Sequence, residues 1–203
     1  MREEGTNIED SNLSGRERLQ AGSQFPEYLD SIITSLAESV QSDEFGTGNR
    51  IQLTRMDYNA PDAPFFWQLI SEEGMPRHSD IAKWALIVKG IAQMAYGSGT
   101  AHRSGTPVGR TLYLGGGHLP FGRSYYSEQR LAALLSARGP ALLNHLDRLF
   151  RLLAKDGCSF DWREMAWFIL SESCDEKAAY ETRAQIARDY YRARWLRLQQ
   201  IQH

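Results

Sequence analysis

The chain has 203 residues, of which 42% are apolar and 24% are charged, and these proportions are typical of a folded globular domain. No apolar run approaches the ~20 residues that a membrane-spanning helix needs, and the N-terminal residues lack the apolar stretch of a secretory signal. The cysteines, Cys158 and Cys174, lack CxxC spacing, which indicates reduced thiols. We therefore expect a cytoplasmic protein without membrane association.

The net charge of −2 is distributed unevenly along the chain. Residues 1–44 hold three arginines and ten acidic residues, a balance of −7, whereas residues 45–203 hold 20 basic and 15 acidic residues, a balance of +5. Sixteen of those 20 basic residues are arginines, which bind phosphate through a planar fork and stack on bases. The bias slightly favours a nucleic-acid partner, although +5 is unremarkable by itself.

The N-terminal part predicts a tail followed by helices. Residues 1–24 are polar and aperiodic, so we expect a disordered acidic tail. Apolar residues recur with helical spacing from Leu29 to Val40, and the glycines of FGTGN predict a turn after this helix. RIQLTRM is expected to be a short connecting segment. Pro64 suits the first turn of a helix over PFFWQLI, and a longer amphipathic helix begins near Ser79.

The second half of the chain shows clear helix boundaries. Ser127 can cap a helix over SEQRLAALLSAR, which Gly139 and Pro140 are expected to end. The leucine-rich helix ALLNHLDRLFRLLAK follows. FDWREMAWFIL begins with an acidic variant of the capping box, formed by Asp161 and Glu164.

A last helix is expected over residues 176–200, and no alternating strand pattern of useful length is present. The fold class is therefore all-α, with two small helical bundles joined by a glycine- and serine-rich linker. The predicted division is a disordered acidic tail at 1–24, an N-terminal helical subdomain at 25–97, a linker at 98–108 and a C-terminal helical bundle at 109–203.

The glycine-rich stretch GGGHLPFGRS, residues 115–124, suggests a phosphate-binding loop at first sight. It lacks both the spacing and the lysine of the GxxxxGK[ST] motif. A dinucleotide fingerprint needs a preceding strand, and no strand is predicted. We therefore interpret the glycines as a flexible loop between helices.

No constellation of catalytic residues is evident in the sequence. The five histidines show neither i, i+4 pairing nor an HExxH motif, and no Cys/His cluster exists. Asp161 precedes a helix, where capping explains it better than catalysis. We therefore expect no catalytic residue, no metal and no cofactor, and we predict that the protein is not an enzyme.

Arginines near helix ends and on polar helix faces, interleaved with aromatic residues, are the remaining signal. Any one of them is most simply a solvated surface residue. Together they could form a groove that follows a phosphate backbone without reading base sequence.

Several motifs stand in a specific order. They are PFFWQLI, PRH before the helix IAKWALIVKGIAQMA, VGRTL, SEQRLAALLSARG, a leucine-rich helix and FDWREMAWFIL. In this order and spacing, residues from about 25 to 195 resemble the CasB-type small subunit of the type I-E CRISPR surveillance complex, Cascade.

The resemblance implies an all-helical, non-catalytic subunit of two small bundles that acts in antiviral defence. Guide pairing reads the sequence, while the protein holds the guide RNA–target DNA duplex and the displaced DNA strand by backbone contacts, which stabilises the R-loop. It further implies as partners the large subunit CasA, the subunits CasC and CasE, and a second copy of this chain.

Basic positions of the family are matched one at a time. Arg55 matches the second arginine of a basic pair whose first position is Thr54 here, Arg77 matches the PRH element, and Arg110 matches the GR element. Arg130 and Arg151 match basic positions on the two following helices.

Two departures from the family pattern exist. Ser136 stands where an arginine is expected, with Arg138 two residues away. SESCDEK is acidic where basic residues are common in the family, so a nucleic-acid contact by this segment would depend on Lys177 or Arg183. The predicted nucleic-acid-binding residues are Arg55, Arg77, Arg110, Arg130, Arg138, Arg151, Arg183 and Arg188.

Two alternatives remain open. A helical protein–protein adaptor would use the arginines to pair with acidic partner surfaces and would have no nucleic-acid role. A nucleotide-dependent enzyme would use the glycine loop, and its nucleotide binding would be lost when Gly116 is replaced.

Overall fold

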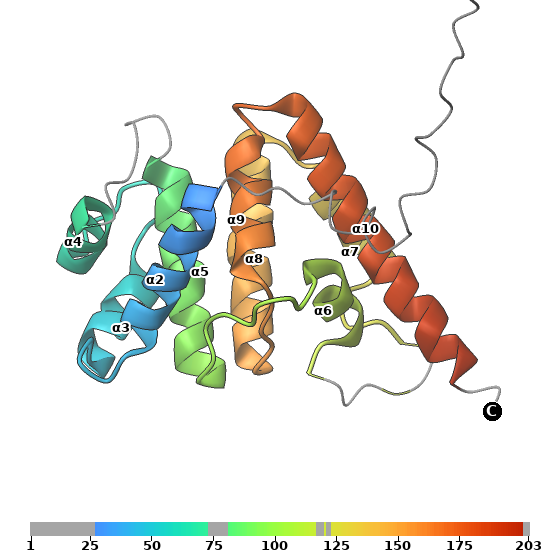
Figure 1. Ribbon diagram of the computed structural model, residues 1–203, viewed down its shortest axis with the longest axis horizontal. Coiled ribbons are helices and arrows are strands. Elements are labelled where there is room, and N and C mark those ends of the chain that lie inside the picture. Colours follow the sequence, from blue (N-terminus) through green and yellow to red (C-terminus); the bar gives the residue numbers. More distant parts are fainter. Residues whose placement is uncertain (1–26, 73–80, 117–119, 121–122, 201–203) are drawn as a thin grey trace, which may run out of the picture.

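The computed structural model describes residues 27–72, 81–116, 120 and 123–200. Within these residues all regular structure is helical, which confirms the predicted all-α class (Figure 1). In chain order the helices are α2 (Glu27–Gln41), α3 (Thr47–Arg55), α4 (Pro64–Glu72), α5 (Ile81–Ser98), α6 (Val108–Leu114), α7 (Glu128–Ser136), α8 (Gly139–Lys155), α9 (Trp162–Ser171) and α10 (Glu176–Gln199). None of the described helices combines the length and apolar character needed to cross a bilayer.

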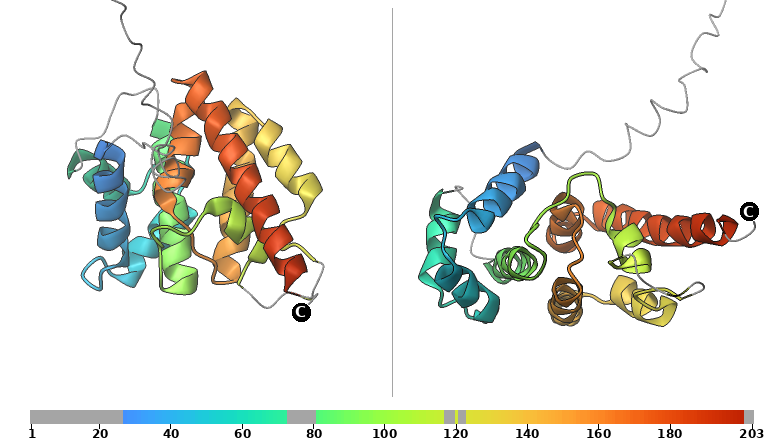
Figure 2. Two further views of the ribbon diagram at one scale, coloured as in Figure 1. Left: turned by 45° about the vertical axis from the view of Figure 1, so that its right-hand side comes forward. Right: turned by 90° about the horizontal axis from the view of Figure 1, so that it is seen from below.

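Helix α5 lies at the centre of the arrangement. It packs against α8 on one side and against α2 and α3 on the other, with α4 outside them (Figure 1). Helix α9 contacts both α2 and α10, and α6 packs along α10. The C-terminal part of α10 projects away from the other helices, as the view from below shows (Figure 2, right).

Aromatic side chains fill the space between α5, α8 and α9. The rings of Phe150 and Trp162 lie 4.8 Å apart between centroids, and Phe160 lies 5.0 Å from Trp162. Gly90 of α5 faces this cluster, where an added Cβ would lie 2.4 Å from the Trp162 ring and 2.7 Å from the Phe150 ring. Glycine is therefore required at this crossing because any side chain would collide with the aromatic core.

The loop between α5 and α6 covers most of the predicted linker, residues 98–108, and it is fastened to the start of α9. The amide N–H of Arg103 donates to Phe160 O (3.0 Å), and that of Asp161 donates to Thr106 O (2.8 Å). The backbone N–H of Trp162 donates to His102 Nδ1 (3.1 Å). Burial lowers the pKa of His102, which favours the neutral ring that can accept this bond. One cluster of buried apolar side chains contains residues from both expected bundles, and the two-bundle division stays a prediction.

Some local predictions are corrected by the structure. RIQLTRM belongs largely to a helix, α3, whose only fully buried residue is Leu53, so its sequence carries little amphipathic signal. The short helix α6 was not expected either. Gly139 and Pro140 begin α8 rather than ending α7, because Pro140 suits a first helical turn and α7 already ends at Ser136.

The capping predictions are confirmed in part. Ser127 accepts from the Arg130 N–H, and Asp161 accepts from the Arg163 N–H at 3.0 Å. Glu164 does not complete the capping box, because the Asp161 N–H is already bonded to Thr106 O. Its Oε2 instead accepts from the Val108 N–H (2.8 Å), which joins α9 to the start of α6.

Candidate nucleic-acid interface

The structure divides the charge between two groups of helices. Described residues 27–72, which form α2, α3 and α4, hold eight acidic and two basic residues. Residues 81–200, which form α5 to α10, hold ten acidic and 17 basic residues. The balances are −6 and +7, so the positive potential that a phosphate backbone needs comes from α5 to α10.

Helix α8 presents a basic stripe that contains one of the predicted residues. Arg148, Arg151 and Lys155 are exposed at i, i+3 and i+7 on the face opposite the leucines. Arg151 pairs with Asp147, which is buried and also pairs with Lys89 of α5 at 3.1 Å. Arg148 and Lys155 have no ion pair with another described residue, and their spacing was visible in the sequence although only Arg151 was selected.

Arg130 and Arg110 are exposed on neighbouring short helices. Arg130 lies in the first turn of α7. Arg110 lies on α6, whose Gly109 packs so closely on α10 that an added Cβ would lie 2.0 Å from Ile186 O. The close contact fixes α6, and therefore the position of Arg110, relative to α10.

The predicted residues of the first half lie differently. Arg55 is exposed in the last turn of α3, within the acidic group of helices. Arg77 lies outside the described residues.

Two predicted arginines meet at the corner where α7, α8, α9 and α10 approach one another. Arg138 donates through Nη1 to the carbonyls of Leu135 (3.0 Å) and Ala137 (2.8 Å) at the end of α7. Arg183 is buried with its guanidinium 5.3 Å from the Phe168 ring centroid. Its Nε and Nη2 have no acceptor among the described residues.

Electrostatics at this corner are unfavourable for a second cation. Burial lowers the pKa of Arg183, the nearby charge of Arg138 lowers it further, and Glu172 opposes both effects. A phosphate contact by Arg183 requires its guanidinium to become accessible, and the contact stays a prediction. Arg188, by contrast, is exposed on α10 and donates to Gln185 Oε1 at 2.8 Å.

The tyrosines after the glycine loop are packed in the protein. Tyr126 is buried, and its carbonyl accepts from the Tyr190 hydroxyl at 2.6 Å. The Tyr125 hydroxyl donates to Leu152 O (2.9 Å) and to Asp156. The pKa of Tyr125 is raised, mainly by burial and then by the hydrogen bond to Asp156. These contacts agree with a packing role. His118 lies outside the described residues, so the loop is described only at its edges.

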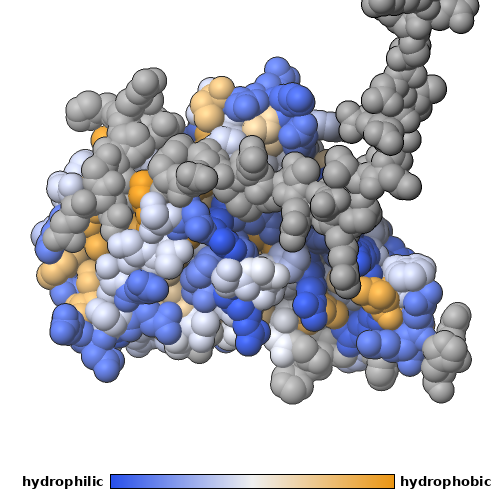
Figure 3. Space-filling model, in the orientation of Figure 1, coloured by the Kyte–Doolittle hydropathy of each residue, from blue (hydrophilic) through white to orange (hydrophobic). Residues whose placement is uncertain are grey.

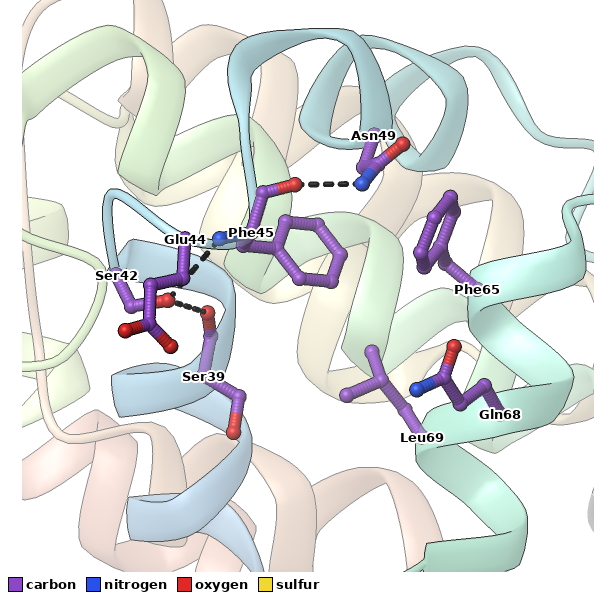
Figure 4. Close-up of a pocket in the computed structure, with 8 residues that line it drawn as sticks. All are labelled: Ser39, Ser42, Glu44, Phe45, Asn49, Phe65, Gln68 and Leu69. Carbon is purple, nitrogen blue, oxygen red and sulfur yellow. Dashed lines mark hydrogen bonds between the residues drawn. The ribbon is translucent and has the colours of Figure 1, made fainter.

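A cavity with a volume of about 260 Å³ lies between α2, α3 and α4 (Figure 4). The rings of Phe45 and Phe65 lie beside each other in this lining, edge to face with centroids 5.5 Å apart, whereas the carboxylate of Glu44 points away from them (Figure 4). Glu44 is the one ionisable side chain in this lining, and no histidine, lysine or cysteine accompanies it or the hydroxyls of Ser39 and Ser42. Within the described part of the chain, no group of three or more His, Cys, Asp or Glu residues is placed to hold a metal ion.

Comparison with known proteins places the chain in a family. No curated protein matches it, and no solved structure matches it either. The profile of the family "CRISPR-associated protein Cse2" matches residues 49–191, which is more than two thirds of the chain. The match confirms the resemblance to the CasB-type small subunit of type I-E Cascade. The chain therefore belongs to the Cse2 family.

Proposed function

We propose that this protein is a non-catalytic, nucleic-acid-binding subunit of a cytoplasmic Cascade complex. It stabilises the R-loop in antiviral defence through sequence-independent contacts to the backbones of the target and displaced DNA strands. The observation that carries the proposal is the net charge of +7 over α5 to α10, with exposed arginines on α6, α7, α8 and α10. Family membership supplies the context of an RNA-guided complex.

Guide pairing supplies sequence recognition in such a complex, so the subunit needs only to recognise shape and charge. Arginine forks bind phosphate oxygens in a bidentate manner, and exposed side chains such as Arg130, Arg148 and Arg151 are accessible for this contact. Neighbouring subunits CasA, CasC and CasE, together with a second copy of this chain, complete the groove around the guide RNA–target DNA duplex and the displaced strand.

A charge-matched comparison tests the proposal. In the assembled complex, the triple variant Arg130→Glu, Arg148→Glu and Arg151→Glu should weaken R-loop binding by more than about tenfold, because each reversal removes a phosphate contact. The control changes Arg103 and Arg123 to Glu, both exposed and outside the predicted set, and its charge-matched partner is the double variant Arg130→Glu and Arg151→Glu. Equal weakening by the two double variants, or no weakening by the triple variant, would contradict the proposal.

The acidic group α2 to α4 favours one second candidate, a protein–protein adaptor that has no nucleic-acid role. Its balance of −6 is suited to basic partner surfaces. Co-purification separates the two candidates: the adaptor joins its partner proteins after nuclease digestion and in the absence of guide RNA, whereas the proposed subunit enters a stoichiometric complex that contains guide RNA.

A further inference from the structure

Exposed large apolar side chains gather on α10. Seven such residues are exposed in the described part of the chain, and five of them belong to this helix: Tyr180, Tyr191, Trp195, Leu196 and Leu198. Figure 3 shows hydrophobic residues at the lower right, where the C-terminal part of α10 lies. A long helix whose outer face exposes large aromatic rings is unusual for a surface that meets only solvent.

The aromatic residues belong to a repeated sequence unit. RDYYRARW contains Arg-x-x-aromatic twice, as Arg188 with Tyr191 and Arg192 with Trp195. Because residues three apart lie on the same side of a helix, each arginine lies one turn before a ring. Four residues separate the two units, which is a rise of ~6 Å along the helix. The result is two neighbouring sites, each with one cation and one ring.

The structure shows that these side chains are exposed. Tyr191 and Trp195 are 46% and 57% exposed, and Arg188 and Arg192 are exposed beside them. Neither arginine forms an ion pair with a described carboxylate. The Tyr191 ring packs edge-on against Tyr190, with centroids 5.3 Å apart, and its hydroxyl donates to Glu128 at 3.3 Å. These contacts hold the ring in place while leaving much of it exposed.

Charge identifies the occupant. From residue 188 to residue 197 α10 carries four arginines and one aspartate, and Arg194 is already paired with Glu128 of α7. Aromatic faces interleaved with arginines bind the bases and phosphates of a single strand, because every base offers a ring face and every nucleotide a negative charge. The spacing of the two units favours successive nucleotides over an acidic protein surface, which does not require paired ring faces.

We propose that Tyr191 and Trp195 stack on bases of single-stranded nucleic acid while Arg188 and Arg192 bind its phosphates. The inference rests on the proposed nucleic-acid-binding function and adds base contacts to the backbone contacts described above. The second unit lies beyond residue 191, where the family match ends. Because stacking on Tyr191 and Trp195 needs accessible base faces, we expect this face of α10 to prefer unpaired strands over duplex.

An abasic strand separates stacking from charge. The full-length protein, within the assembled complex, is titrated with labelled oligothymidine and with an abasic oligonucleotide of equal length and phosphate number. We expect oligothymidine to bind at least about tenfold more tightly, since each stacked base contributes roughly that factor. The double variant Tyr191→Ala and Trp195→Ala should lose this advantage and leave binding of the abasic strand unchanged, whereas Trp195→Phe should retain it.

Tyr180→Ala is the matched control, because Tyr180 is 72% exposed on the same helix but lies between Glu176 and Glu181. It should bind both strands like the unchanged protein. Equal affinity for the two strands would overturn the stacking inference and leave the proposed function intact. Failure to bind either strand would overturn both. A double variant that loses a partner subunit while binding oligothymidine normally would show a protein-binding surface instead, and would also overturn the inference.

Discussion

The two ends of α9 differ in how an arginine beside them is paired: Arg163 is partly buried and Arg183 is buried. At the start, Arg163 donates to Asp161 and Ser104 and pairs with Asp30 at 2.7 Å, so its guanidinium is well supplied with acceptors. At the end, Arg183 is buried against Phe168 with two nitrogens lacking an acceptor among the described residues. An arginine of this chain is therefore not automatically available to bind phosphate, since the partners of Arg163 all lie within the fold.

The largest expected effect concerns Asp161 at the well-paired end. Burial alone would raise its pKa, but hydrogen bonds from Arg163 and Gly105 hold the pKa below its usual value. Asp161→Ala removes the helix cap and leaves Arg163 short of its main partner, so the free energy of unfolding should fall by about 3 kcal/mol. Urea denaturation measures this loss. Asp30→Ala, at a far more exposed partner of Arg163, should cost less than about 1 kcal/mol, and an equal loss would contradict the comparison.

A smaller effect concerns Glu164, three residues further along α9. Burial raises its pKa from 4.5 to about 7. The folded protein therefore holds this proton more tightly than the unfolded chain does, and the stability that protonation gives is complete below pH 4.5 and lost as pH rises through 7. We expect Glu164→Gln, which stays neutral, to lack this contribution to the pH dependence. At pH 8 the free energy of unfolding of Glu164→Gln, measured with heat or urea, should exceed that of the unchanged protein by about 2 kcal/mol. If the variant and the unchanged protein show the same dependence of this free energy on pH, the account is contradicted.

The smallest effect is expected at the poorly paired end. Arg183→Met replaces a buried cation by an apolar side chain of similar length, so the free energy of unfolding should stay the same or rise by about 1 kcal/mol. Arg163→Met should lower it, because that change breaks a satisfied network. Opposite signs for the two variants in parallel urea titrations support the comparison. A clear loss of stability from Arg183→Met would show that its guanidinium has acceptors after all.

Local signals in the sequence predicted much of the fold. The Ser127 cap, the leucine stripe of α8 and the extent of α10 follow from cap chemistry and helical spacing, which depend on neighbours within a few residues. Helix α3 was missed because it buries little, and tertiary contacts rather than amphipathicity stabilise it.

The candidate site was less accessible to sequence reasoning. Glu164 binds the Val108 N–H across 56 residues, a pairing that no local pattern encodes. The burial of Arg183 had a signal, since it lies three and seven residues before Ile186 and Tyr190 on the inward side of α10. The availability of each arginine depends on which carboxylates tertiary folding brings to it.

The salt dependence of R-loop binding tests the central claim most directly. We compare the slope of log affinity against log salt concentration for complexes with and without the subunit. If the subunit neutralises five or six phosphates, its presence should make this slope more negative by roughly 4. Removing Arg130, Arg148 and Arg151 by charge reversal should reduce that contribution to roughly −2, because each lost contact to a single strand accounts for about 0.7. A contribution near zero, or a slope that the triple variant leaves unchanged, would contradict the account.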